Sequence, residues 1–338
     1  MNYRSRNGLS LLKWVIVACW LVVATHGVAS EADIGVRAIP TPEELGAQAQ
    51  VYRYSLEMEG RHTLKTLLIK LDSPRWILST LQGLRHSSVA ANHNVPPSLW
   101  GVLHDRQIAD YTRVAFERLA DMAGFSIVDL VRLSTGADLD TLGVATQRYD
   151  WLTVTVLATA GAGTNAMRVG TDYGDWFENK HVPRETGASE STSSEESIPF
   201  GTINVIVLTN ASLGDAQMAR SIITVTEAKT AVLQDLGIRS SYTPEAMATG
   251  TGTDEVMIVS GSGRSVTCAG GHCKPAQLIG WAAKEAVETA LVRQIRLHYD
   301  GLTGEPPIKL PEQVLRHPLF RQGFTRPQYE PIAPAAKR

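Results

Sequence analysis

The sequence predicts a layered α/β or α+β sandwich, in which long helices pack on a mostly β-sheet core within a single catalytic domain. The composition is that of a globular protein, with 43% hydrophobic and 20% charged residues among 338. Segments rich in β-branched residues alternate along the chain with long segments of helical spacing, and no internal repeat interrupts them. Because each element buries its apolar face against another, such a chain folds in packed layers.

The N-terminus has the three parts of a secretory signal peptide. A basic start is followed by an unbroken apolar run from Trp14 to Ala24, and small residues at 28–30 precede Glu31. A spanning helix needs about 20 apolar residues, which favours cleavage near Ser30 over a retained anchor. We expect residues 1–30 to be removed and the protein to be exported to the periplasm. The alternative is an uncleaved segment that holds it at the outer face of the inner membrane.

The first part of the mature chain predicts one short helix and two strands. Residues 31–50 are expected to form a lead-in that becomes helical at Glu43. Two apolar and β-branched stretches predict strands, Lys65–Leu71 and Trp76–Leu81.

A long helix and a strand are expected next. From residue 105 to residue 133, apolar residues recur every three or four positions, which predicts an amphipathic helix broken near Gly124. Residues 151–158 alternate and are rich in Val and Thr, which predicts a strand.

The second half predicts strands and helices in alternation. Strands are expected at 202–208 and 256–259. A helix is expected over 213–236, with Asp215 near its N-cap, and another from Pro275 to about residue 298, because proline is favoured in the first helical turn.

Two segments fall outside the predicted core, and the domain is therefore placed at residues 31–300. Residues 184–197 hold five Ser and four Glu without a large apolar side chain, which predicts a disordered loop. Residues 301–338 hold seven of the 16 prolines and predict a tail that lies extended over the domain or floats free.

Charge and cysteine content limit the partners. The chain has 32 Lys and Arg against 34 Asp and Glu, a net charge of −2. It therefore lacks the excess of basic residues that is typical of proteins that bind nucleic acid. Removal of the signal segment leaves two cysteines, Cys268 and Cys273, which could pair in an oxidising compartment or remain free thiols. No second Cys or His pair has the spacing of a zinc site, so no metal is predicted.

Two glycine-containing turns carry candidate binding residues. The first holds Asn165 and Arg168 after the strand at 151–158; it is either a turn whose backbone faces a ligand or a plain turn. A dinucleotide fingerprint is disfavoured there, because no helix pattern follows. The second turn leads from Gly201 to Asn204, where Thr202 either starts a strand or is the nucleophile of a self-cleaving hydrolase.

Three further clusters hold titratable groups. Lys229 follows Thr226 and Glu227 and lies on the apolar stripe of the helix expected at 213–236, where an ammonium needs a partner. The stretch Ala248–Asp254 combines glycines with hydroxyl groups and one carboxyl, and is either a ligand cradle or a structural turn. His272 precedes an expected helix, whose N-terminal dipole favours the neutral, basic imidazole.

In their order, these motifs resemble the adenosylcobinamide amidohydrolases of cobamide salvage. The resemblance covers roughly Tyr52 to Leu297. The main stretches that carry it are Thr-Ala-Gly-x-x-x-Asn-Ala-x-Arg at 159–168, Gly-Thr-Ile-Asn at 201–204, Thr-Glu-Ala-Lys at 226–229, Ala-Thr-Gly-Thr-Gly-Thr-Asp at 248–254, Gly-His-x-Lys at 271–274 and Leu-Ile-Gly at 278–280. Residues 75–80 and Asn92 resemble the N-terminal part of the family more loosely.

The resemblance implies hydrolysis of the amide that joins a corrin side chain to aminopropanol, with cobyric acid as the product. The corrinoid and its cobalt are then the substrate, and no catalytic cofactor is implied. Expected catalytic residues are Glu227, Asp254 and His272 as acid or base, with Lys229 orienting Glu227 or stabilising negative charge. Expected substrate-binding residues are Asn165, Arg168, Asn204, Thr226, Thr251, Thr253 and Lys274. Activated water is the simplest nucleophile, with Thr226 or Thr253 as alternatives.

The export signal suggests that the protein acts on corrinoids outside the inner membrane. A second hypothesis is an exported corrinoid-binding protein without catalysis. The third, self-processing before Thr202, predicts two chains instead of one. The sequence leaves the oligomeric state open.

Overall fold

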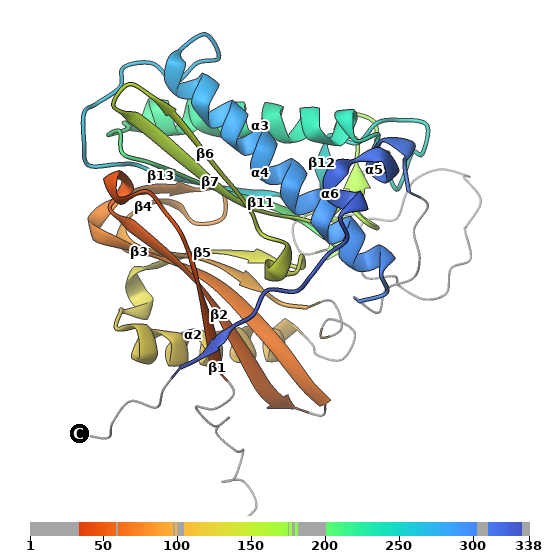
Figure 1. Cartoon of the computed structure of the whole chain (residues 1–338), viewed down its shortest axis with the longest axis horizontal. Helices are drawn as coiled ribbons and strands as arrows, with labels where there is room; N and C mark the ends of the chain where they lie inside the picture. Colours follow the sequence, from red (N-terminus) through yellow and green to blue (C-terminus); the bar gives the residue numbers. More distant parts are fainter. Residues whose placement is uncertain are drawn as a thin grey trace, which may run out of the picture.

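The computed structural model describes residues 34–332 except 59, 97–98, 100–104, 175, 178–179, 182–200 and 303–309 (Figure 1). The predicted signal segment and the predicted loop at 184–197 lie outside the described residues. Within the described part, no helix is both long and apolar enough to cross a membrane.

The fold is α+β, built on one large curled sheet of ten strands. The strands are ordered β14-β1-β2-β3-β13-β11-β7-β6, and β4 continues from β3 to β5. Their bounds are β1 Ile34–Ile39, β2 Ala47–Met58, β3 Gly60–Ser79, β4 Gly83–Asn94, β5 Leu130–Thr135, β6 Gly143–Tyr149, β7 Leu152–Ala160, β11 Ile203–Thr209, β13 Glu255–Val259 and β14 Glu330–Pro331.

The smaller elements lie around this sheet. Two short strand pairs are β8 (Ala166–Met167) with β12 (Gly250–Thr251), and β9 (Trp176–Phe177) with β10 (Lys180–His181). The helices are α2 (Asp105–Ala123), α3 (Asp215–Asp235), α4 (Lys274–Tyr299), α5 (Glu312–Arg316) and α6 (Pro318–Arg321).

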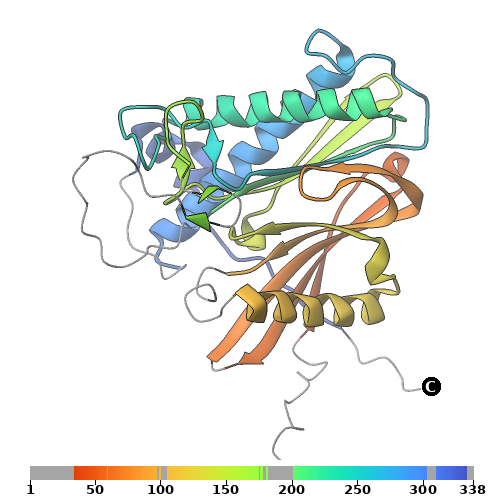
Figure 2. The same cartoon turned by 180° about the vertical axis from the view of Figure 1, so that it is seen from behind.

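The sheet folds over itself into two layers because β3 belongs to both. Its first part pairs with β2, and its last residues, Ile77–Ser79, pair with β13. The ladder to β4 is irregular between Lys70 and Arg75, where the strand bends. Helices α3 and α4 cover one outer face and α2 covers the other, so the order of layers is helix, sheet, sheet, helix (Figures 1 and 2).

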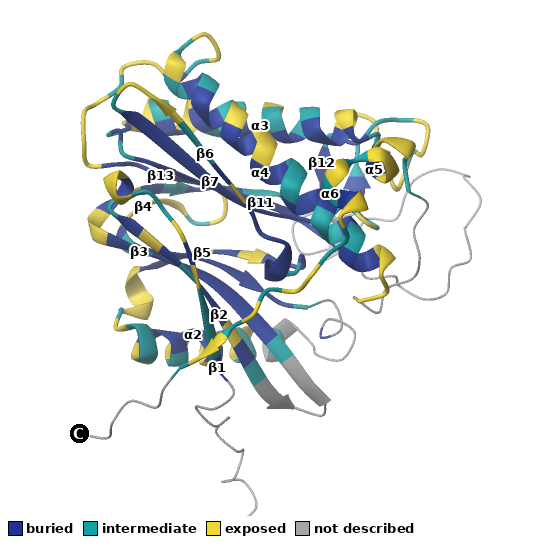
Figure 3. Ribbon diagram, in the orientation of Figure 1, coloured by how far each residue is buried: buried dark blue, intermediate teal, exposed yellow. Residues whose placement is uncertain are grey.

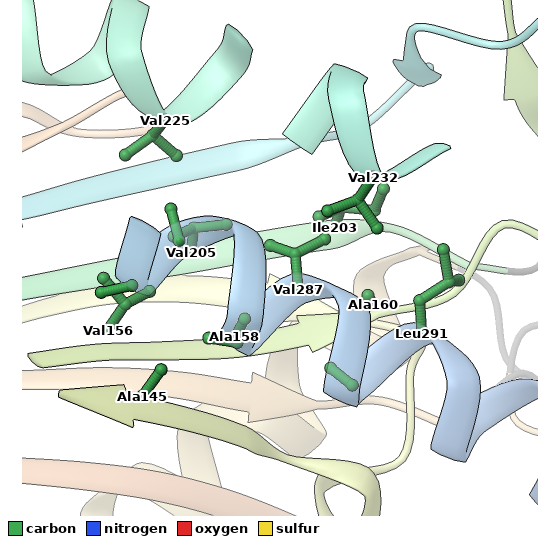
Figure 4. Close-up of a cluster of buried hydrophobic side chains, with 14 of the residues drawn as sticks. Ala145, Val156, Ala158, Ala160, Ile203, Val205, Val225, Val232, Val287 and Leu291 are labelled. Atoms are coloured by element: carbon green, nitrogen blue, oxygen red, sulfur yellow. The ribbon is translucent and has the colours of Figure 1, made fainter. Parts of the chain in front are cut away.

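Buried side chains fill all three spaces between these layers (Figure 3). Under α3 and α4, Val225, Val232, Val287 and Leu291 meet the valines and alanines of β7 and β11 (Figure 4). Small residues on α4 let it approach the sheet closely.

Two expectations for the first part of the chain were only partly right. A helical turn begins at Glu43, as predicted, but it is a single 3₁₀ turn, Glu43–Leu45, ended by Gly46 at φ +56°. In the described part of the predicted lead-in, residues 34–50, most of the other residues lie in β1 and β2. The alternation of buried Ala47, Ala49 and Val51 has the period of a strand.

The two strands expected at 65–71 and 76–81 form the single strand β3. Pro74 lies within its irregular segment, where a missing N–H is tolerated. A proline inside one long strand is therefore easily taken for a break between two.

The helix expected from residue 105 ends at Ala123, and Gly124 adopts φ +67°, which confirms the predicted break near Gly124. Residues 130–133 lie in β5 instead, because Leu130, Val131 and Leu133 are buried in the layer next to β4. The predicted helices at 213–236 and 275–298 and the strands at 151–158, 202–208 and 256–259 match α3, α4, β7, β11 and β13 within a few residues.

The described part of the C-terminal tail, residues 310–332, lies against the domain (Figure 1). It forms α5 and α6, and β14 then extends the sheet beside β1. Arg326 and Tyr329 bind Asp140, whose carboxylate also pairs with the buried Lys65. These bonds anchor the tail to the domain.

Gly143 tests the close contact between β6 and α4. A Cβ at this position would collide with the backbone carbonyl of Ala286. We expect Gly143→Ala to lower the free energy of unfolding by about 1–3 kcal/mol, measured by urea denaturation. Gly271→Ala is the control, because a Cβ at Gly271 meets no atom within 4 Å; equal effects of the two changes would contradict the packing argument.

His93 tests burial in the layer between the sheet and α2. Its Nδ1 lies 2.8 Å from the Thr66 hydroxyl, and burial lowers its pKa to about 3. In the unfolded chain the His93 imidazole binds a proton below pH ~6.5, whereas in the folded protein it stays neutral down to about pH 3. The free energy of unfolding therefore decreases as the pH falls from ~6.5 toward 3, by up to about 1.4 kcal/mol per pH unit. We expect His93→Gln to flatten this acid slope in urea titrations, whereas the same change at the exposed His86 should leave the slope intact.

Candidate functional site

The starts of β11 and β13 define the candidate site. The two strands are parallel neighbours, with Asn204 beside Glu255, so the segments that precede them meet at one edge of the sheet. The turn after β7, which carries Asn165, reaches the same edge, because β7 runs antiparallel to β11. Three of the sequence motifs therefore converge although they lie far apart in the chain.

Asp254 is the centre of a closed hydrogen-bond network. Its Oδ1 accepts from the backbone N–H of Ile203 at 3.0 Å and from the Thr251 hydroxyl at 2.6 Å. Its Oδ2 accepts from the backbone N–H of Thr251 at 3.0 Å and from the ammonium of Lys229. A carboxylate offers about four acceptor sites, so Asp254 is saturated by protein donors.

Lys229 finds in Asp254 the partner that its position on α3 requires. The two side chains are 9% and 12% exposed. The ion pair crosses from α3 to the segment between β12 and β13, and a Cβ on Gly250 would collide with both charged groups. Gly250, the first glycine of the Thr-Gly-Thr-Gly-Thr-Asp stretch, thus leaves space for the ion pair.

Hydroxyl and amide groups extend the site toward the turn after β7. The Thr202 hydroxyl donates to the backbone carbonyl of Thr253, and the Thr253 hydroxyl lies 3.4 Å from the carbonyl of Gly201. Asn165 donates through Nδ2 to that same carbonyl, while its buried Oδ1 has no hydrogen-bond partner among the described residues. A buried amide oxygen without a donor is costly, and a ligand N–H could satisfy it.

A second polar network lies between the two sheet layers at this edge. Asn204 donates to Asn92 on β4 at 3.0 Å and to the carbonyl of Ser134 on β5 at 2.7 Å. Asn92 donates in turn to the hydroxyl of Thr159 on β7 at 2.9 Å. Asn92, Thr159 and Asn204 are at most 1% exposed, so this network replaces apolar packing at the edge of the core.

Glu255 borders this network and was not recognised from the sequence. Its Oε2 accepts from the backbone N–H of Ser134 at 3.0 Å and lies 3.4 Å from Asn204 Nδ2. Burial raises the pKa of its carboxyl above the usual value. The sequence pattern offers one indication: Glu255 is two positions before Met257 on the same strand, so the two side chains point to the same face, and Met257 is buried.

Other expected residues lie near the site without facing it. Thr226 and Glu227 are on the exposed side of α3, and the Thr226 hydroxyl donates to the carbonyl of Ile222. Arg168 donates to the backbone carbonyl of Met247 at 3.1 Å, which ties two loops together.

His272 and Lys274 are at the opposite end of the sheet. They lie where α4 begins, beside the start of α3, as the hydrogen bond from Gln217 to the carbonyl of Thr267 indicates. In Figure 1, β12 (Gly250–Thr251), which precedes Asp254 in the chain, lies at the other end of α3. Lys274 contacts the Tyr149 ring at 4.4 Å from its centroid. The structure therefore does not bring the histidine together with Asp254.

Cys268 and Cys273 are joined by a disulfide, with their Cα atoms 6.1 Å apart. The bond closes the loop that carries His272 immediately before α4. In the described ranges, no group of three or more His, Cys, Asp or Glu side chains could hold a metal ion.

Comparison with known proteins agrees with this arrangement of motifs. The sequence profile described as adenosylcobinamide amidohydrolase matches residues 49–299. The chain belongs to this family. The match includes every residue of the two networks and excludes β1 and the tail with β14.

One similar curated protein and one similar solved structure accompany the family match. The uncharacterized protein MJ1613 of Methanocaldococcus jannaschii is 38% identical over 245 residues, which cover 72% of this chain and 92% of that protein. A crystal structure of the PH0078 protein from Pyrococcus horikoshii covers 78% of this chain and 84% of its own, with 11% identity and a TM-score of 0.32. So low a TM-score supports no inference about fold or function.

Removing the ammonium of Lys229 tests the ion pair. Lys229→Met leaves the Asp254 carboxylate nearly buried without its cation, and we expect a loss of about 3–5 kcal/mol in the free energy of unfolding. Lys284→Met is the matched control, because its partner Asp235 is largely exposed, and it should cost no more than about 1 kcal/mol. Urea denaturation measures the free energy of unfolding of both variants. Similar losses would mean that the buried ion pair stabilises the fold no more than the exposed one.

Proposed function

We propose that the protein hydrolyses the amide between a corrin side chain and aminopropanol in adenosylcobinamide, with adenosylcobyric acid as the product. The observation that carries the proposal is the paired polar network at the starts of β11 and β13, within the segment that matches the family. A corrin ring is fringed with amides, which need both donors and acceptors at fixed positions. Asparagine and threonine side chains supply both kinds of group.

The ion pair of Lys229 and Asp254 serves to hold this site in place. Asp254 fixes the start of β11 through the N–H of Ile203 and fixes the turn at Thr251, so its acceptor sites are used for structure. The Lys229 charge remains close enough to favour a developing negative charge nearby. Asn165 Oδ1, which lacks a partner in the part of the chain that the structure describes, is suited to accept a hydrogen bond from a substrate amide.

Hydrolysis requires a nucleophile, a group that takes its proton, donors for the oxyanion and a proton for the departing amine. Water is the simplest nucleophile, since the Thr226 hydroxyl is engaged by its own helix. The Thr253 hydroxyl and the Asn165 amide lie on the turns that flank the site and are the proposed contacts to the substrate.

We also propose that the protein acts outside the inner membrane. The disulfide between Cys268 and Cys273 supports this location, because such bonds persist in oxidising compartments. The basic and apolar start of the sequence supports export as well. The substrates are then corrinoids that have not yet entered the cytoplasm.

Incubation of residues 31–338 with adenosylcobinamide, followed by mass spectrometry, tests the function. We expect adenosylcobyric acid and free aminopropanol to appear in equal amounts, because one amide bond is cleaved for each water consumed. Cyanocobinamide in a parallel reaction reports whether the adenosyl ligand is required. Binding without turnover, followed by the corrinoid absorbance, would instead support a corrinoid-binding protein without catalysis.

A further inference from the structure

The two neighbouring carboxyl groups at the start of β13 have opposite environments. Successive residues of a strand point to opposite faces, so Asp254 turns toward α3 while Glu255 turns toward the space between the two sheet layers. Asp254 is paired with a cation and bound by three further donors. Its acceptor sites are therefore occupied by donors of the protein itself.

Glu255 retains a free oxygen. Its Oε2 receives the hydrogen bonds from Ser134 and Asn204, whereas Oε1 has no hydrogen-bond partner among the residues that the structure describes. Glu255 is only partly buried, so solvent has access to this residue. The carboxyl is thus held in one orientation with one oxygen open.

The groups in contact with Glu255 are neutral. They are the backbone of Ser134 on β5 and the Asn204 amide on β11, and in the described part of the chain no cation pairs with the carboxyl. The nearby charge of Asp254 is compensated by Lys229. Burial without a cation raises the pKa of Glu255, which brings it closer to neutral pH than that of an exposed glutamate.

We propose that Glu255 is the general base and acid of the amide hydrolysis, a role that rests on the proposed function. Its carboxylate takes a proton from water as the water oxygen bonds to the amide carbon. The C–N bond then breaks, and the same proton passes from Glu255 to the nitrogen of the departing aminopropanol. The carboxylate is restored, and one water is consumed for each amide cleaved.

The fixed donor to Glu255 comes from an unpaired strand edge. Strand β5 pairs with β4 on one side, and its other edge offers the N–H of Ser134 to the carboxylate. A second N–H of this edge, that of Arg132, is bound by the Gln82 side chain. The carboxyl therefore spans the two layers, and its position follows from their spacing.

Glu255→Gln tests the role, because it keeps the shape and an acceptor for Ser134 while removing the titrating group. We expect kcat to fall by about 10²–10⁴-fold, while the Kd for adenosylcobinamide stays within about threefold of the original protein. Glu117→Gln, the same change at an exposed residue of α2, is the matched control and should leave both constants unchanged.

Glu255→Asp supplies a second readout. It retains a carboxyl but withdraws it by one methylene, and we expect kcat to fall by about 10²-fold. Because the base must be deprotonated, the rate of the original protein should fall as the pH drops through the raised pKa of Glu255. The variant should show this acid limb at a different pH.

The outcomes separate the two proposals. If the original protein leaves adenosylcobinamide unchanged, the proposed function fails and the role of Glu255 falls with it. If the original protein is active and Glu255→Gln keeps its kcat within about threefold, the role alone is overturned. Should Glu255→Gln not fold, an acid limb of Glu255→Asp that coincides with that of the original protein overturns it equally.

Discussion

The bend in β3 is the constraint on which the rest of the structure depends. One strand supplies hydrogen bonds to both sheet layers, so the layers cannot separate or slide independently. Arg75 fixes the bend: its guanidinium is buried, donates to the carbonyl of Leu45 at 2.7 Å and pairs with Asp72. The spacing of the layers then decides which side chains meet between them. Asn92 from one layer and Asn204 from the other reach hydrogen-bond distance at the edge where the candidate site lies.

The parallel pairing of β11 and β13 brings the residues of the candidate site together at one edge of the sheet. Parallel neighbours begin at the same edge, and α3 must return across the sheet to connect them, which carries Lys229 over the strand starts. The pleat then gives adjacent carboxyls different surroundings, one paired with a cation and one next to neutral donors. Two chemically similar side chains are thereby held by different partners, and burial raises the pKa of Glu255.

Elements with strong local periodicity were predictable from the sequence, whereas long-range pairing was not. Helices α3 and α4 and the strands β7, β11 and β13 each repeat their apolar residues at the period of the element. Strand β4 gave no such signal, because its last residues, among them Asn92, turn polar groups into the interior. The motifs of the site were also recognisable, but a sequence does not say at which end of a sheet a loop lies. His272 was therefore grouped with Asp254 although the fold separates them, and Glu255 was overlooked beside its neighbour.

The pairing of β14 with β1 joins the two ends of the described chain. Gly35 lies opposite Pro331, so almost the whole sequence separates the partners of this ladder. Contacts of such separation form slowly, because the entropy of closing the intervening chain must be overcome first. The outer edge of β1 stays open until β14 has docked on it, and an open strand edge can pair with another chain. The edge of β1 is thus expected to be covered late in folding, and until then it is exposed to pairing with other chains.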